Sequence, residues 1–171
     1  QGKSVVLLCA PSQVLALFAV ADTLKASSQE AIAELHQLGI KTCMLTGDNA
    51  HTAAAIALQA GIDEAHGNLL PEHKLAAIQT LQGNGQIVGM VGDGINDAPA
   101  LAQANIGFAM GAAGSDSAIE TADVALMDDD LRKIPAFIRL SRRTAAILKQ
   151  NIALALGVKA LFLLITLTGH A

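Results

Sequence analysis

The sequence predicts an α/β fold, a parallel sheet with flanking helices, followed by one transmembrane helix. Short apolar runs alternate with helical patterns through the first 130 residues, which is typical of parallel sheets. An almost uncharged run lies near the C-terminus. All 15 acidic residues lie at or before Asp130, whereas seven of the 11 basic residues follow it. This division indicates that the two parts of the chain occupy different environments.

The composition excludes several classes of protein. Hydrophobic residues make up 52% of the 171 residues and charged residues 15%, which excludes a disordered or collagen-like chain and allows a buried core. Aromatic residues make up only 2%, too few for stacking on single-stranded nucleic acid, so no nucleic-acid partner is expected. The two cysteines, Cys9 and Cys43, form neither a disulfide framework nor a Cys-x-x-Cys pair, which favours a reducing compartment.

Turn and cap residues divide the first 61 residues into elements. A proline and a serine separate two apolar runs, and a glycine closes each of the two helical patterns that follow. The expected elements are strands at 4–10 and 14–21 around Pro11-Ser12, a helix at 28–38 between a cap at Ser27 or Ser28 and Gly39, a strand at 40–45, and a helix at 49–59 ended by Gly61.

The same signals divide residues 71 to 130. A proline opens the next helical pattern, a Gly-Asn-Gly sequence ends it, and apolar runs then alternate with short helical patterns. The expected elements are a helix at 72–81 between Pro71 and Gly83-Asn84-Gly85, strands at 86–91, 106–110 and 124–127, and helices at 96–104 and 117–122.

Polar loops follow two of these strands. They are Thr46-Gly47-Asp48 and Gly92-Asp93-Gly94-Ile95-Asn96-Asp97. In such sheets ligands bind beyond the carboxyl ends of the strands, and a glycine beside a helix N-terminus suits a phosphate. The carboxylates of Asp93 and Asp97 and the carboxamide of Asn96 are oxygen ligands that suit Mg²⁺. Lys74 offers a positive charge to a transferring phosphoryl group. Together these residues indicate phosphoryl chemistry.

Two of these motifs have an ordinary structural alternative. Thr46-Gly47-Asp48 alone could be a turn and a helix cap, and Lys74 alone could be a solvated helix residue. The Gly-Asp-Gly-x-Asn-Asp loop is harder to explain without a function, because several turn-type residues there cost stability.

The apolar run from Ile152 to Thr168 contains 17 residues and one charge, Lys159. Spanning a bilayer takes roughly 17–25 residues, and a buried core helix is the alternative. Six basic residues before the run favour a span entered from the cytoplasm; a surface-bound amphipathic helix or a calmodulin-type target is less economical. An intramembrane ammonium marks a functional site by default, with snorkelling as the alternative. Asn151 and Lys159 lie on one stripe of the expected helix.

These residues resemble the haloacid dehalogenase-like phosphorylation domain of P-type ATPases, a Rossmann-like parallel sheet. The resemblance covers essentially the whole chain, and its extended last motif is highly specific. The matching motifs are Thr46-Gly47-Asp48, Pro71-x-x-Lys74 and the run from Gly92 to Leu101, with Met110-Gly111 and Asp22-Thr23-Leu24-Lys25 as further matches.

The resemblance implies a role for each site residue. Thr46 and Lys74 would contact an aspartyl phosphate, and Asp48 would position nucleotide or phosphate, with Gly47 in the same binding loop. Asp93 would bind Mg²⁺, with Asp97 as a further ligand, while Asn96 and Asp97 order the site. The implied cofactors are Mg²⁺ and ATP.

The basic segment and the span resemble the penultimate membrane helix of heavy-metal-transporting (type IB) pumps. Copper pumps tend to carry Tyr-Asn where this sequence has Val158-Lys159. Asn151 with Lys159 instead resembles the zinc, cadmium and lead exporters, in which the lysine acts beside the transport site. The implied partners are ATP, a soft divalent cation (Zn²⁺, Cd²⁺ or Pb²⁺) and the lipid of the inner or plasma membrane, with residues 1–150 cytoplasmic.

The resemblance also implies a division into domains. The end of a nucleotide-binding domain and a return strand would occupy 1–21, the phosphorylation domain 22–130, a basic linker helix 131–150 and the transmembrane helix 151–168. The Asp-Lys-Thr-Gly-Thr motif with its nucleophilic aspartate, the Cys-Pro-Cys metal helix and the last membrane helix do not occur in the sequence. We therefore expect part of a pump that is inactive alone.

Three alternatives remain open from the sequence. A soluble phosphatase of the same superfamily would use the same loops, although it needs an Asp-x-Asp sequence upstream of Thr46, which the chain lacks, and it leaves the apolar run unexplained. A copper pump is disfavoured by Lys159. A non-enzymatic module could keep the fold alone. The five histidines show no ligand spacing, so none is assigned to a metal, and surface or capping positions are expected for them.

Overall fold

The computed structural model describes residues 4–10, 13–20, 24–111 and 116–169. The chain divides into two compact units, residues 1–133 and 134–171, and each is described by itself. The elements are β1 (Ser4–Ala10), β2 (Gln13–Val20), α1 (Ala26–Gln37), β3 (Cys43–Leu45), α2 (Ala50–Ala60), β4 (Glu64–His66), α3 (Pro71–Gly83), β5 (Gly89–Gly92), the 3-10 turn η1 (Ile95–Asp97), α4 (Ala98–Gln103), β6 (Ile106–Met110), α5 (Asp116–Thr121), β7 (Val124–Leu126) and α6 (Lys133–Leu167).

The strands form three ladders. β1 and β2 pair as an antiparallel hairpin, whose register shifts between Leu8 and Cys9. β3 pairs with β4 in parallel, and β5, β6 and β7 form a parallel sheet in that order. Helices α2, α4 and α5 are the connections between successive parallel strands, as parallel pairing requires. The predicted α/β fold with parallel strands is confirmed.

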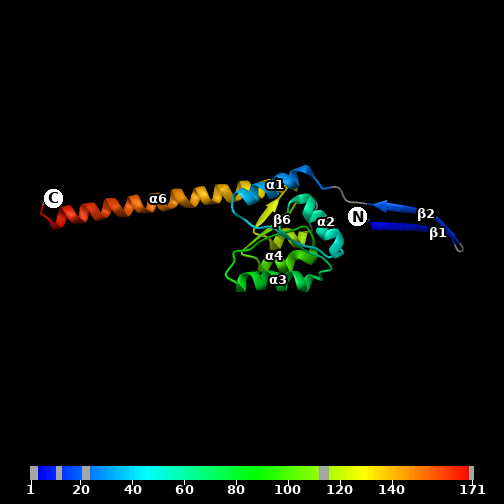
Figure 1. Cartoon of the computed structure of the whole chain (residues 1–171). Coiled ribbons are helices and arrows are strands. Elements are labelled where there is room, and N and C mark those ends of the chain that lie inside the picture. The colour runs from blue at the N-terminus through cyan, green and yellow to red at the C-terminus, as the bar shows by residue number, and fades with distance from the viewer. Residues whose placement is uncertain (1–3, 11–12, 21–23, 112–115, 170–171) are drawn as a thin grey trace. The chain divides into compact units, whose positions relative to one another are not determined.

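The hydrophobic core lies where helices cover the sheet of β5, β6 and β7. Small and branched side chains dominate it, so helices and strands approach closely. Figure 1 shows α3 and α4 beside each other near β6. The buried cluster consists of Ile78 from α3, Met90 from β5, Ala100 and Leu101 from α4, Ala109 from β6 and Ala118 from α5.

Several element boundaries differ from the predictions. α1 begins at Ala26 with Lys25 as its N-cap, which makes no side-chain cap bond, so the predicted cap at Ser27 or Ser28 is wrong. β3 and β5 are shorter than expected because Ile40–Thr42 and Gln86–Val88 precede the ladders. The turn η1 precedes α4, which therefore begins at Ala98, two residues after the predicted start. The end of the predicted strand at 14–21 and the turn at Pro11-Ser12 lie outside the described residues.

Helix α6 is one continuous helix of 35 residues, and Figure 1 shows it without a break. It joins the predicted basic segment and the predicted span in a single element. It is long and apolar enough to cross a membrane, and its most apolar 18-residue stretch is not buried within the described chain. By length and composition, the helix is a candidate membrane span.

Candidate active site

Thr46 and Asp48 form a compact loop directly after β3. The Thr46 hydroxyl donates to the Asp48 carboxylate at 3.1 Å and accepts from the Asp48 backbone N–H at 3.1 Å. The Thr46 backbone N–H donates to the His66 carbonyl at 3.0 Å, which extends the β3–β4 pairing by one residue. Thr46 is half-buried, whereas Asp48 is exposed. The loop therefore presents a hydroxyl and a carboxylate at the carboxyl end of the ladder.

A second segment holds this loop from the side of β4. The backbone N–H of Asn68 donates to the Asp48 carbonyl at 2.6 Å, and that of Leu69 donates to the Thr46 carbonyl at 3.0 Å. A Cβ atom added to Gly67 would lie 2.6 Å from the Cα of Ala50. No real side chain tolerates that distance, so the absence of a side chain at residue 67 lets the two segments touch.

Lys74 and Asp97 form an ion pair that is largely shielded from solvent. The Lys74 Nζ lies 2.8 Å from the Asp97 Oδ1, and their side chains are 16% and 11% exposed. Among the residues whose burial the structure describes, Asp97 is the only charged residue that is buried. Lys74 lies in the first turn of α3, where the helix dipole disfavours a cation. The carboxylate of Asp97 offsets that cost, so the alternative of a freely solvated Lys74 is wrong.

The loop after β5 packs tightly under Asp97. A Cβ added to Gly92 would lie 2.7 Å from the Cβ of Asp97, so the missing side chain at residue 92 makes room for the buried carboxylate. Asp93 and Asn96 are exposed. Their oxygens, with the second oxygen of Asp97, are hard donors of the kind that Mg²⁺ takes, usually beside several water molecules.

The predicted site residues fall into two pairs, Thr46 with Asp48 and Lys74 with Asp97. Within the described residues no hydrogen bond or ion pair joins one pair to the other. Asn151 and Lys159 lie in the second unit on α6, both exposed, and the eight-residue interval between them spans about 12 Å of helix.

Polar contacts that the sequence did not predict hold the β3–β4 half of the site. The Asp63 Oδ2 accepts from the Thr42 backbone N–H at 2.7 Å and from the Thr42 hydroxyl at 2.9 Å, and it lies 3.0 Å from the His36 Nε2. The backbone hydrogen bond is the largest cause that holds the pKa of Asp63 below its usual value. Asp63 thus connects α1 and the residue before β3 to the segment before β4.

The histidines take the expected surface or capping positions where the structure describes them. The Nδ1 of His73 accepts from the backbone N–H of Leu70 at 3.3 Å and so caps α3. His36 and His51 are exposed, and His170 lies outside the described residues. His66 is exposed as well, and it lies beside Cys43 and Glu64, whose side chains are of types that can bind a metal ion. Sequence spacing gave no sign of this group, because parallel pairing brings together residues far apart in the chain.

Comparison with known proteins relates this site to metal pumps. The haloacid dehalogenase-like hydrolase family matches residues 1–105. A probable cadmium-transporting ATPase of Listeria monocytogenes is 53% identical over 170 residues, which cover 99% of this chain and 24% of that protein. A copper-exporting P-type ATPase of Bacillus subtilis is 50% identical over 161 residues, covering 94% of this chain and 20% of that protein.

A solved structure gives the same result. The crystal structure of a zinc-transporting PIB-type ATPase in its E2.Pi state is 48% identical, with a TM-score of 0.90, over 99% of this chain and 28% of that one. This chain therefore spans about a quarter of the length of the relatives it matches. The predicted resemblance to heavy-metal P-type ATPases is confirmed.

Proposed function

Because this chain belongs to the haloacid dehalogenase-like hydrolase family, we propose that it is the phosphorylation domain and one transmembrane helix of an ATP-driven pump that exports a soft divalent metal ion. The observation that carries the proposal is 53% identity to a probable cadmium-transporting ATPase across 99% of the chain. The TM-score of 0.90 and the 48% identity to a zinc-transporting ATPase also support it. Zn²⁺ and Cd²⁺ are the cargo that these relatives suggest, and Pb²⁺ follows from the sequence resemblance alone.

The pump would work through an aspartyl phosphate. The sequence holds no Asp-Lys-Thr-Gly-Thr motif, so the aspartate that attacks the γ-phosphorus of ATP would come from a part of the protein outside these 171 residues. ADP leaves as the acyl phosphate forms, and water later releases inorganic phosphate. The role of this chain is to hold the phosphoryl oxygens while that exchange takes place.

Lys74 and Thr46 would bind those oxygens. The ammonium of Lys74 is fixed by Asp97 at 2.8 Å, which leaves two of its three N–H donors for phosphate. The hydroxyl of Thr46 donates to Asp48 in this structure and would turn to the phosphate when one is bound. Asp48 would then be free to position nucleotide or phosphate, and Asn96 would order the loop after β5.

Asp93 would bind Mg²⁺, with the second oxygen of Asp97 as a further ligand. The fit rests on the donor chemistry, since Asp93 is exposed and only one oxygen of Asp97 is used by Lys74. When bound, Mg²⁺ neutralises phosphate charge and so favours attack by an anionic carboxylate. Gly92 supports the arrangement, because its missing side chain leaves room for Asp97.

Helix α6 would place Lys159 and Asn151 beside the transport site within the membrane. Basic residues before the apolar run favour residues 1–150 on the cytoplasmic side. A fixed ammonium near a vacated metal site would repel a returning cation. The copper-exporting relative, at 50% identity, keeps copper as the second candidate, and Lys159 is the residue that argues against it.

The test uses the full-length protein that contains this chain, reconstituted in proteoliposomes with Mg²⁺ and ATP. We expect Zn²⁺ or Cd²⁺ to stimulate ATP hydrolysis, and Lys74→Ala to abolish phosphoenzyme formation. Lys159→Met should reduce metal-stimulated turnover while leaving the phosphoenzyme intact. Stimulation by Cu⁺ alone would identify a copper pump. Release of the protein by alkaline carbonate, together with hydrolysis of small phosphate esters, would favour the phosphatase alternative.

A further inference from the structure

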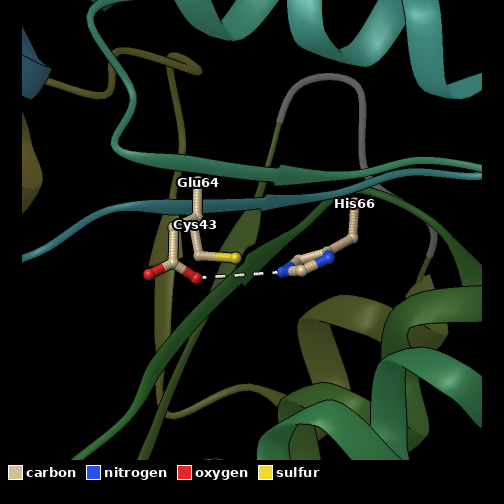
Figure 2. A group of neighbouring side chains, drawn as sticks. All are labelled: Cys43, Glu64 and His66. Atoms are coloured by element: carbon tan, nitrogen blue, oxygen red, sulfur yellow. Dashed lines mark ion pairs between the residues drawn. The ribbon is translucent and has the colours of Figure 1, made fainter.

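A thiol, an imidazole and a carboxylate meet on one face of the β3–β4 ladder. Cys43 pairs with Glu64, and Leu45 pairs with His66. Because side chains alternate along a strand, Glu64 and His66 share a face, and Figure 2 shows the thiol of Cys43 beside them. One ligand atom from each residue lies within 4.8 Å of the others, and all three residues are exposed.

These three side chains have weak partners inside the described part of the chain. The Nε2 of His66 lies 3.9 Å from the Oε2 of Glu64, which is too long for a hydrogen bond. The Sγ of Cys43 lies 4.0 Å from the carbonyl oxygen of Met44, a weak contact for a thiol. None of the three is therefore committed to a strong interaction, and their side chains can rotate toward a common ligand.

The donor set matches a zinc-class cation. Zinc binds cysteine sulfur at about 2.3 Å and histidine nitrogen or carboxylate oxygen at about 2.0–2.2 Å in a tetrahedron, which places ligand atoms about 3.5 Å apart. The present separations need a contraction of about 1 Å, which rotation of exposed side chains supplies. Magnesium and calcium prefer oxygen donors alone, so thiolate and imidazole select against them.

We propose that Cys43, Glu64 and His66 bind one zinc-class divalent ion, Zn²⁺ or Cd²⁺, with water in the fourth position. The site would be separate from the Mg²⁺ ligands after β5 and from any transport site in the membrane. It rests on the three side chains and their positions on the ladder, and it holds whether or not the pump function holds. The ion would join β3 to β4 through Cys43, three residues before Thr46, and through His66, whose backbone carbonyl already accepts from the Thr46 N–H.

The experiment titrates the full 171-residue chain, in detergent micelles with excess Mg²⁺, against Cd²⁺. We expect one equivalent to bind with an ultraviolet sulfur-to-cadmium charge-transfer band, and Zn²⁺ to compete for the same site. Cys43→Ser should abolish the band. Glu64→Gln and His66→Gln should keep the band but weaken Cd²⁺ affinity at least about tenfold each, because each removes one of three protein ligands.

Matched variants separate this site from other binding. Cys9→Ser removes the other thiol, and His51→Asn removes another exposed histidine, so both should bind Cd²⁺ as the unmodified chain does. Loss of the band in Cys9→Ser would overturn the proposal. Unchanged affinity in both Glu64→Gln and His66→Gln would also overturn it, because the thiol would then bind alone. Circular dichroism checks that each variant is folded.

Discussion

The two parallel ladders of the first unit are stabilised by different interactions. The sheet of β5, β6 and β7 contributes Met90, Phe108, Ala109 and Leu126 to the buried residues. No residue of β3 or β4 is buried. The buried side chains near that ladder are small alanines of α1 and α2. The contacts of Asp63 with Thr42 and the backbone bonds around Thr46 add polar interactions to them.

This difference bears on how the candidate site works. We call the sheet of β5, β6 and β7 with its helices the packed half, and the β3–β4 ladder with its loops the polar half. Lys74 and Asp97 lie against the packed half and have a fixed geometry, whereas Thr46 and Asp48 lie on the polar half. Regions with few buried apolar contacts open at lower free energy than the core. A loop that must turn from an internal hydrogen bond to a bound phosphate fits the polar half, and a lysine that must stay in place fits the packed half.

The largest effect is expected from the ion pair in the packed half. Lys74→Met leaves the carboxylate of Asp97 buried without a partner, which should lower the free energy of unfolding by about 3 kcal/mol. The double variant Lys74→Met/Asp97→Asn removes both charges and should recover part of that loss. The chain has no Trp or Tyr, so urea unfolding is followed by circular dichroism. A single variant as stable as the unmodified chain would contradict a structural role for the pair.

Truncation of a core side chain should come next. Leu101 is 1% exposed, and Leu101→Ala should cost about 2–3 kcal/mol, from lost burial and from the cavity left behind. The matched control is Leu58→Ala on α2, where the leucine is 84% exposed and the change should stay within about 0.5 kcal/mol. The same urea experiment measures both variants. Equal losses in the free energy of unfolding would mean that Leu101 does not lie in the core.

A smaller effect is expected at the close approach behind the Thr46 loop. Gly67→Ala forces a Cβ against the backbone of Ala50, and we expect a loss of about 1–3 kcal/mol. Faster hydrogen exchange at the Thr46 amide should accompany it. Gly83→Ala, which has open space around it in α3, should be neutral or stabilising. Identical exchange rates in Gly67→Ala and the unmodified chain would show that the approach does not hold the loop.

The smallest effect concerns pH and the polar half. Hydrogen bonds from Thr42 lower the pKa of Asp63 below the ordinary value of 3.8. A carboxylate with a lowered folded pKa stabilises the fold above its unfolded pKa, and this contribution is lost as pH falls through the folded value. Asp63→Asn should therefore flatten the fall in stability below about pH 4. An unchanged acid profile would mean that other carboxylates cause the fall.

Asp130 provides the control for that measurement. The hydrogen bond from the Arg132 side chain is the largest cause that lowers its pKa to about 2, and Arg132 also pairs with Glu30 at 3.1 Å. By the same sign, Asp130→Asn should remove a stabilisation that the unmodified chain begins to lose as pH falls below the ordinary value of 3.8 and has almost lost at about pH 2. Both variants should therefore show a shallower fall in stability than the unmodified chain over this acid range.

The sequence predicted the packed half better than the polar half. The short apolar run Ile106–Met110 marks β6 at its observed bounds, and Asn49 and Gly61 mark the ends of α2 because they act as its cap and its left-handed terminus. β4 was missed, since Glu64-Ala65-His66 has no apolar pattern and exists through pairing with β3. Short strands formed by tertiary contacts carry little local signal.

The site shows the same division. The loops at the strand ends and their residue types were predictable, because the order of strands and glycine-containing loops is local information. The ion pair of Lys74 with Asp97 joins residues 23 positions apart, and no local pattern specifies it. The cluster of Cys43, Glu64 and His66 depends on strand register in the same way. The assigned roles in phosphate, Mg²⁺ and metal transport stay predictions.

The unbroken course of α6 has a mechanical consequence. Thirty-five residues give a rod about 52 Å long, whereas the hydrocarbon layer of a bilayer is about 30 Å thick. The helix therefore extends well beyond any membrane it crosses. A rod of hydrogen-bonded turns transmits tilt and rotation along its length, so a small rocking of the apolar end would become a larger sweep at the other end. A displacement of one end would therefore be transmitted to the other end, because no loop interrupts the helix.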